Sequence, residues 1–213
     1  MNKHKVTILC TDPAHPVNAW LERWTAEVAP KADVSILRDA TQVKGGDFLF
    51  LVSCHQIIRR STRDHFRHSL VLHASPLPHG RGMSPHIWQV LEGATKLTLT
   101  LLNAEDEVDS GDIWLQREFE VPPTALYDEI NARLFDAEVT LMHWALENCD
   151  TARPRAQYGQ PTIYRRRRPQ DNRIDPERSL GESFDLMRVA DPDRYPAFFE
   201  FRGQKYRIRI DKL

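Results

Sequence analysis

The chain has 213 residues, of which 41% are hydrophobic and 28% are charged, and its formal net charge is -1. This length fits one α/β domain with an extension, and it can bury a core without disulfides or metals. The nearly neutral charge excludes a global attraction to nucleic acid or to a membrane surface, so neither is expected as a partner.

The amino terminus begins with a short apolar run, residues 5–10, which breaks at Thr11. This run is too short to span a membrane or to form a signal peptide, and it predicts a first β-strand. The three cysteines, Cys10, Cys54 and Cys149, are odd in number and lack metal-ligand spacing. Such cysteines are typical of free thiols in a reducing compartment. We therefore expect a cytoplasmic protein without a metal site.

Strands and helices alternate through the next part of the chain. Apolar residues at helical spacing predict a helix over residues 17–28. Strands are predicted at 32–37 and 47–53, and the second is continuously apolar, as is typical of a parallel strand buried on both faces. A charged helical stretch at 60–67 then leads into an apolar strand at 69–74.

A loop rich in proline and glycine follows that strand, at residues 75–85, and predicts a fixed turn. A helix is expected over 84–91, with Ser84 as its N-cap and a proline at its first position. Alternating residues predict a strand at 96–102. The longest helical pattern covers 124–147.

This order of elements predicts an α/β fold with a mainly parallel, Rossmann-like sheet flanked by helices. Ligands should bind at the carboxyl ends of its strands. No GxGxxG motif follows the first strand, so an ordinary dinucleotide site is not indicated. We divide the chain into a first domain, 1–150, and a linker with a small C-terminal extension, 151–213. The extension is predicted to be one helix and a hairpin that turns at 202–204.

The C-terminal part is basic, with 15 Lys and Arg against 9 Asp and Glu from residue 151 onward. This excess favours an anionic ligand such as a phosphate. The arginine run at 165–168 could contact a phosphate or RNA, although four like charges in a loop are most often solvated. The hairpin edge and its aromatic pair, Phe198 and Phe199, could serve a homodimer.

Two segments after predicted strands carry groups suited to chemistry. The first runs from His73 to Gly82 (HASPLPHGRG), and the second from Asp106 to Asp112 (DEVDSGD). A parallel sheet would place both at the same edge. A histidine and a carboxylate that meet there form a general base with an orienting partner. His73 alone would be a structural histidine and Asp109 alone a turn residue, so their spacing carries the case for catalysis.

Together the two segments resemble the signature of the folate-dependent formyltransferases, N-x-H-x-S-x-L-P-x-x-x-G followed by D-x-G-D. The matching residues are His73, Ser75, Leu77, Pro78, Gly82, Asp109, Gly111 and Asp112. The resemblance covers residues 48–119 well. It implies that residues 1–150 form a formyltransferase catalytic domain.

The resemblance further implies transfer of a formyl group from 10-formyltetrahydrofolate to an amine. His73 would manage the proton of the attacking amine, and Asp109 would fix the tautomer of His73. The cofactor would be held by Ser53, Cys54, His55, Gln56, Asn103, Ala104, Glu105 and Asp106. The substrate would be held by Ser75, Leu77, Pro78, His79, Gly80, Arg81, Gly82 and Ser84.

Two further stretches are most similar to the small sugar N-formyltransferases of nonulosonic (pseudaminic-type) acid biosynthesis: residues 70–91, with SPHIWQVLEG, and the later PTIYRRRRPQD at 161–171. They imply a nucleotide-linked amino sugar as substrate. Methionyl-tRNA formyltransferases use a full-size second domain for tRNA, and the segment after residue 150 is shorter than that. We therefore rank methionyl-tRNA formylation second.

The chain departs from the signature at Val71, where the family has an asparagine that donates a hydrogen bond to the formyl oxygen. Loss of one such donor costs about 10²–10³ in turnover. A backbone N–H, an imidazolium at His73 or another polar side chain would have to replace it. Otherwise the protein is a slow enzyme or a folate-binding relative that does not catalyse. A purely structural or interaction module rests on the fold alone, and fold does not define function.

Overall fold

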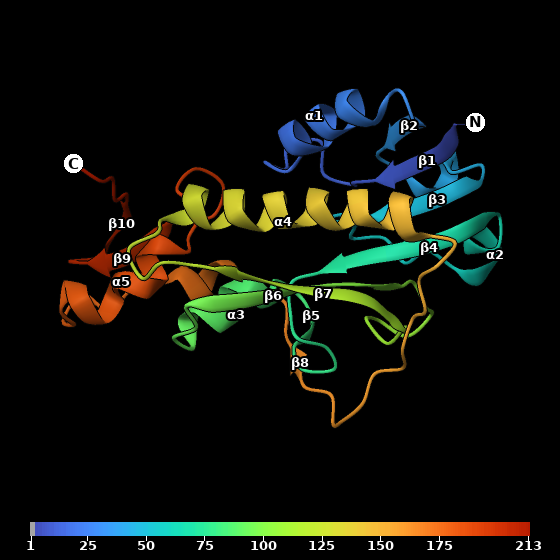
Figure 1. Cartoon of the computed structure of the whole chain (residues 1–213). Helices are drawn as coiled ribbons and strands as arrows, with labels where there is room; N and C mark the ends of the chain where they lie inside the picture. Colours follow the sequence, from blue (N-terminus) through green and yellow to red (C-terminus); the bar gives the residue numbers. More distant parts are fainter. Residues whose placement is uncertain (1–2) are drawn as a thin grey trace.

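A six-stranded sheet forms the centre of the computed structural model, which describes residues 3–213 (Figure 1). The strand order is β2-β1-β3-β4-β6-β7. Its strands are β1 (His4–Leu9), β2 (Ala32–Leu37), β3 (Gly46–Leu51), β4 (Phe66–His73), β6 (Lys96–Asn103) and β7 (Ile113–Glu120). All pairs from β2 through β4 are parallel, so the prediction of a mainly parallel α/β sheet is confirmed.

Strand β6 runs antiparallel to both β4 and β7. His73 is paired with Thr100, and Leu70 with Asn103, so the carboxyl end of β6 lies beside the middle of β4. The expectation that both motifs leave the sheet at its carboxyl edge was therefore wrong for the second motif. The loop after β6 still begins close to His73, because three residues of a strand span only about 10 Å.

Strand β7 was not predicted from the sequence. Its inner residues Ile113 and Trp114 are buried, whereas Arg117 and Glu118 are exposed. A strand at the edge of a sheet carries charged residues because water solvates its free side, and this weakens the alternation by which strands are recognised.

Two helices, α1 (Asn18–Val28) and α4 (Tyr127–Asn148), cover one face of the sheet (Figure 1). Trp24 from α1 and Phe135 from α4 pack into one core cluster with Phe50 and Leu70 from the sheet. Each of these side chains is at most 4% exposed, and full burial of such a side chain contributes roughly 1.5–3 kcal/mol. The apolar residues at helical spacing therefore form the faces of α1 and α4 that pack against the sheet.

Short elements and loops cover the other face. The 3-10 helix η1 (Ala40–Gln42) and the single turn α2 (Arg60–Arg63) lie over an apolar cluster of Leu9, Leu49, Ile58 and Phe66. The predicted helix over 60–67 is shorter than expected, because Phe66 already belongs to β4 and packs in this cluster.

Helix α3 (Pro85–Leu91) begins after Ser84, as predicted, with the proline at its first position. The capping hydrogen bond expected from Ser84 is absent, since Ser84 has a left-handed backbone with φ 52°. In that conformation its side chain does not accept a bond from the first turn of the helix.

The C-terminal part contains β8 (Ile163–Tyr164), η2 (Pro169–Asn172), α5 (Leu180–Arg188), β9 (Ala197–Phe201) and β10 (Gln204–Ile208). Strands β9 and β10 form an antiparallel hairpin, which confirms the predicted helix and hairpin. Arg202 and Gly203 both have positive φ, as a two-residue hairpin turn requires. Strand β8 pairs with the short strand β5 (Arg81–Gly82). The domain boundary at residue 150 stays a prediction.

Between residues 3 and 213, no helix combines the length and apolar character needed to cross a membrane.

Glu138 is a buried acidic residue of α4, the helix that covers one face of the sheet. It is 5% exposed, and its Oε2 has no hydrogen-bond partner. Burial raises the pKa of Glu138 from an ordinary 4.5 to about 8. Between these pH values the folded chain holds a proton that the unfolded chain releases. The contribution of Glu138 to stability is therefore full below pH 4.5 and is lost as pH rises through about 8.

We expect Glu138→Gln to remove this pH dependence, because glutamine has no proton to lose. The free energy of unfolding of the variant should exceed that of the wild type by an amount that grows between pH 5 and pH 9, on the order of several kcal/mol. Urea titrations across this range measure it. Glu147→Gln is the matched control, since Glu147 lies exposed on the same helix and pairs with Lys31. Parallel stability curves for the wild type and Glu138→Gln would refute the expectation.

Candidate active site

His73, the last residue of β4, meets Asp109 from the loop between β6 and β7. The distance from His73 Nδ1 to Asp109 Oδ1 is 3.4 Å, and both side chains are only 8% exposed. On the other side of the ring, His73 Nε2 lies 2.8 Å from Gly80 O. Each ring nitrogen therefore faces an oxygen that can accept its proton. The structure thus brings together the two residues that the sequence singled out.

Asp109 has a left-handed backbone, with φ 54°. Its Oδ2 accepts a hydrogen bond from Gly82 N at 2.8 Å, which leaves Oδ1 toward His73. Gly111 of the same motif allows a close approach, because a Cβ at that position would lie 2.0 Å from Asn103 O. In the D-x-G-D motif, Asp109 therefore directs its carboxylate at His73, and Gly111 allows the loop to pack against Asn103 at the end of β6.

The predicted substrate loop is tied directly to this pair. Gly80 offers its carbonyl to His73, and Gly82 offers its N–H to Asp109. Both glycines have positive φ, and a Cβ at Gly82 would lie 2.3 Å from Tyr164 O. Only glycine fits these positions, so the glycines of this loop orient the candidate catalytic groups.

The other residues predicted to contact substrate lie in different environments. Ser75 is fully buried, and its carbonyl accepts a hydrogen bond from Thr100. Leu77 and Pro78 are also buried, joined by a cis peptide bond, and His79 is exposed. Arg81 pairs with Glu107 at 2.8 Å, and Ser84 is half-buried. Their contacts with a substrate stay predictions.

The first predicted cofactor segment, 53–56, follows β3 at the carboxyl edge of the sheet. His55 N donates to Thr11 Oγ1 at 3.0 Å, and Ser53 Oγ lies 3.3 Å from His15 Nε2. Gln56 Oε1 accepts from the backbone of η1, and Cys54 is half-buried, with the pKa of its thiol raised by burial. The β1 end thus holds this loop in place.

The second predicted cofactor segment, 103–106, is anchored on β4 and β7. Asn103 Oδ1 accepts from Trp114 Nε1 at 2.7 Å, and Ala104 N donates to Ser69 O. The carboxylates of Glu105 and Asp106 both pair with Arg63.

Arg63 was missed by sequence reasoning. It is 7% exposed, and its Nη1 donates to Ile58 O at 2.6 Å and to Asp106 at 2.8 Å. The hydrogen bond from Arg63 holds the pKa of Asp106 below its usual value. Arg63 therefore connects the segment after Asn103 to the chain that continues from Gln56. Nothing in the local sequence distinguishes it from the neighbouring arginines.

Two further histidines, His15 and His86, have lowered pKa values. Burial lowers the pKa of His15 to about 4, and its Nδ1 accepts a hydrogen bond from Val17 N. Packing also lowers the pKa of His86 to about 4, with His15 and His73 among the groups that act on it. Both rings are therefore neutral near pH 7.

Val71, where the family has asparagine, packs with Leu77, Leu102 and Ile113. Its position in β4 puts it on the same face of the sheet as His73, since both lie at alternate positions of one strand. The side chain is apolar and donates no hydrogen bond.

Two members of the arginine run, Arg165 and Arg167, are engaged within the protein. Arg165 makes two hydrogen bonds to Asp171, at 2.8 and 2.6 Å. Arg165 and Arg167 also lie over the ring of Trp88, at 4.9 and 5.1 Å. Trp88 is half-buried outside the core clusters and is stacked near Tyr164. These contacts occupy Arg165 and Arg167, whereas Arg166 and Arg168 are exposed.

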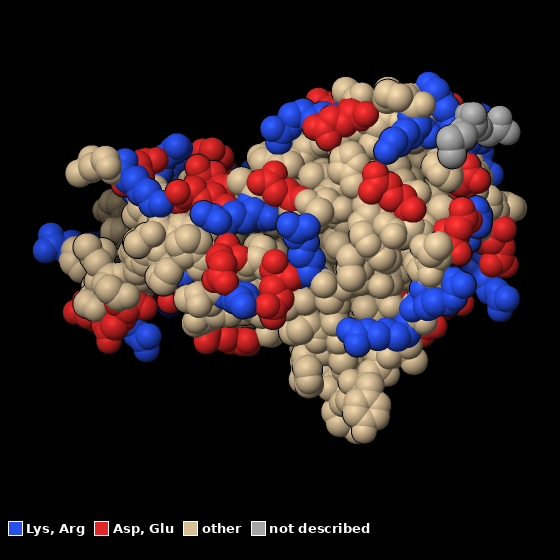
Figure 2. Space-filling view, viewed as in Figure 1, with Lys and Arg blue, Asp and Glu red and all other residues tan. Residues whose placement is uncertain are grey.

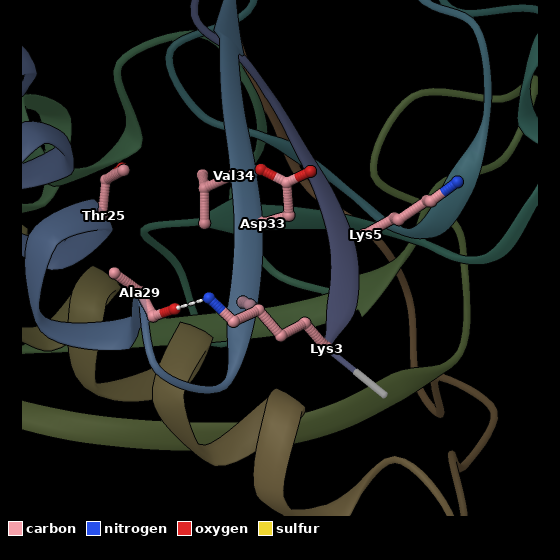
Figure 3. Close-up of a pocket in the computed structure, with 7 residues that line it drawn as sticks. Lys3, Lys5, Thr25, Ala29, Asp33 and Val34 are labelled. Carbon is pink, nitrogen blue, oxygen red and sulfur yellow. Dashed lines mark hydrogen bonds between the residues drawn. The ribbon is translucent and has the colours of Figure 1, made fainter. Parts of the chain in front are cut away.

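A cavity of about 530 Å³ lies away from this site, at the amino ends of β1 and β2. Figure 3 shows that Lys3 points to Ala29 O, to which it donates at 2.7 Å, whereas Lys5 extends away from it. The two lysines do not converge on one point, and the cavity holds no pair suited to acid–base chemistry. Within residues 3–213, no group of three or more His, Cys, Asp or Glu is arranged to hold a metal ion.

The chain is similar to known proteins in sequence and in fold. A methionyl-tRNA formyltransferase from Acidobacterium capsulatum is 31% identical over 163 residues, which cover 75% of this chain and 52% of that protein. The chain thus spans about half the length of the curated relatives it matches.

Solved structures share the fold at lower identity. A methionyl-tRNA formyltransferase from Clostridium thermocellum aligns with a TM-score of 0.81 at 22% identity, over 94% of this chain and 89% of that one. HypX from Aquifex aeolicus, solved in complex with tetrahydrofolic acid, aligns with a TM-score of 0.82 at 19% identity, over 96% and 37%. A sugar N-formyltransferase from a Shewanella species aligns with a TM-score of 0.73 at 16% identity, over 97% and 96%.

The family model described as formyl transferase matches residues 10–146, which contain His73, Asp109 and both predicted cofactor segments. On this match, the chain belongs to the formyl transferase family.

Proposed function

We propose that this protein transfers a formyl group from 10-formyltetrahydrofolate to the amine of a nucleotide-linked amino sugar. The observation that carries the proposal is the approach of His73 to Asp109, at 3.4 Å, inside the region that matches the family. The complex of HypX with tetrahydrofolic acid supports a folate as the donor.

Unpaired polar atoms beside the pair fit a site that binds further polar groups. Ser75 Oγ and Arg81 Nε are buried without a hydrogen-bond partner. Both belong to the loop that carries Gly80, and Ser75 lies against Gly80. A buried donor without a partner is costly, so a ligand oxygen bound there would be stabilised. The backbone of segments 53–56 and 103–106 would hold the folate, which supplies the formyl carbon.

In this mechanism the substrate amine forms a bond to the formyl carbon, and the bond from that carbon to the folate nitrogen breaks. His73 accepts the proton that the amine loses and delivers it to the departing nitrogen. Asp109 stabilises the imidazolium that exists between these two steps. Nε2 is the ring atom that would face the substrate, because Nδ1 faces Asp109, and it would exchange Gly80 O for the reacting groups.

The choice of an amino sugar rests on the similarity of residues 70–91 and 161–171 to sugar N-formyltransferases and on the Shewanella sugar N-formyltransferase, which aligns with this chain over nearly all of both. The methionyl-tRNA formyltransferase from Clostridium thermocellum aligns over a similar share of both chains, so coverage does not separate the two substrates. Methionyl-tRNA formylation is the second candidate, favoured by the sequence identity to enzymes of that name. We also propose that residues 1–150 carry the catalysis, that the protein is cytoplasmic and that it can form a homodimer.

A substrate panel tests the proposal. The chain is incubated with 10-formyltetrahydrofolate and either 4-amino-sugar nucleotides or charged initiator tRNA, and products are identified by mass spectrometry. We expect formylated sugar nucleotide and unmodified aminoacyl-tRNA. Formylation of the tRNA alone would replace the substrate in the proposal. Tight folate binding without any transfer would identify a non-catalytic relative.

A further inference from the structure

A segment after α4, residues 155–164, crosses the loops that carry the candidate catalytic pair; we call it the strap. In Figure 1 it is the orange chain that runs below the sheet to β8. Arg155 forms a β-bridge with Ile113, and β8 pairs with β5. Thr162 accepts a hydrogen bond from Gly80 N at 2.8 Å. The strap therefore contacts both motifs, although it follows Asp109 by more than forty residues in the chain.

The outer part of the strap is uncharged and projects from the body of the protein. Figure 2 shows this projection without Lys, Arg, Asp or Glu. Tyr158 and Ile163 on it are 96% and 77% exposed. Gln157, by contrast, is half-buried and turns toward the site. Exposure thus separates Gln157 from its neighbours on the strap.

The side-chain amide of Gln157 forms hydrogen bonds with both motif loops, through its nitrogen and through its oxygen. Its Nε2 donates to Asp109 O at 2.7 Å and to Gly111 O at 2.9 Å. Its Oε1 accepts from Arg81 Nη2 at 2.9 Å, which fixes which end of the amide carries the N–H groups. One side chain therefore joins the D-x-G-D loop to the loop that holds Gly80 and Gly82.

One of these hydrogen bonds is made to the backbone of Asp109, which has a left-handed conformation. A non-glycine residue in the left-handed region is strained, and it persists there only when its surroundings hold it. Asp109 is in that region, and it is held by Gly82 N at its side chain and by Gln157 at its carbonyl. We propose that Gln157 is a positioning residue that keeps the Asp109 carboxylate directed at His73. This inference rests on the proposed function, in which that carboxylate supports the imidazolium.

Two variants of Gln157 test the proposal. Gln157→Leu removes all three hydrogen bonds, and Gln157→Glu keeps an acceptor for Arg81 but sets a carboxylate against two carbonyls. Gln160→Leu is the matched control, because Gln160 is an exposed glutamine on the same strap. We expect both Gln157 variants to lower kcat by about tenfold to a hundredfold. The KM for the sugar nucleotide should stay unchanged, and the acidic limb of the pH profile of kcat/KM should move.

A purely structural role predicts a different pattern. It would lower the melting temperature and leave kcat and the pH profile of the folded enzyme unchanged, and that result would overturn the proposal.

If the wild type formylates no substrate, the proposed function fails and the positioning role is judged by NMR. The Nδ1 resonance of His73, observed through long-range proton–nitrogen correlations, should move in Gln157→Leu and not in Gln160→Leu. An unmoved resonance would also overturn the proposal.

Discussion

Replacing His73 with alanine should lower kcat for formyl transfer by about 10²–10⁴-fold, the usual contribution of a positioned acid–base group. The substitution removes the group that moves the proton while leaving segments 53–56 and 103–106 intact. Folate affinity should therefore persist. Single-turnover kinetics measure the chemical step, and isothermal titration with tetrahydrofolate measures binding.

The control for this experiment is His65→Ala, an exposed histidine just before β4. We expect it to retain wild-type turnover. Because β4 carries His73 at its end, thermal melts of both variants should accompany the kinetics. Unchanged turnover in a folded His73→Ala protein would remove the proposed mechanism.

Asp109→Asn should reduce kcat to a similar extent, by about 10²–10⁴-fold. The asparagine oxygen can still accept from Gly82 N, so the loop keeps its anchor. Its NH₂ group would then face His73 Nδ1 and donate to it. The ring would be held in the wrong tautomer, and no negative charge would support the imidazolium. The pH dependence of kcat/KM, with KM measured separately, tests this expectation.

Asp112→Asn is the matched control, because Asp112 belongs to the same motif, has an exposed side chain and acts on β6 through its backbone carbonyl. It should leave kcat unchanged. Equal losses in Asp109→Asn and Asp112→Asn would mean that the loop, rather than the Asp109 carboxylate, matters for turnover.

Local sequence patterns were sufficient to predict a helix or strand where its apolar residues form one buried surface. The continuous apolar run of β3 predicted a strand buried on both sides, and the structure places it between two parallel strands. The helical pattern over 124–147 predicted α4, whose buried face includes Ile130, Leu134 and Leu141. These signals are read from sequence because burial acts on residues that are neighbours along a single helix or strand.

The meeting of His73 and Asp109 was predicted from two short motifs, although the reason given for it was partly wrong. A parallel β6 was assumed, and the strand is antiparallel. The predicted proximity was still correct, because β6 is paired with β4. The loop after Asn103 therefore starts beside β4, only a few residues from His73. Strand direction depends on connections across the whole sheet and leaves little trace in the eight residues of β6.

The sequence by itself therefore determined the class of the fold, the order of nearly all its elements and the two motifs that supply the histidine and the carboxylate. Only the tertiary structure decided what orients them: Gly80 and Gly82 on one side and Gln157 from the strap. It also decided that Arg63 anchors the second predicted cofactor segment. Those contacts join residues far apart in the chain. A side chain's partner across such a distance is set by packing and by the need of buried polar groups for hydrogen bonds, and no local pattern encodes it.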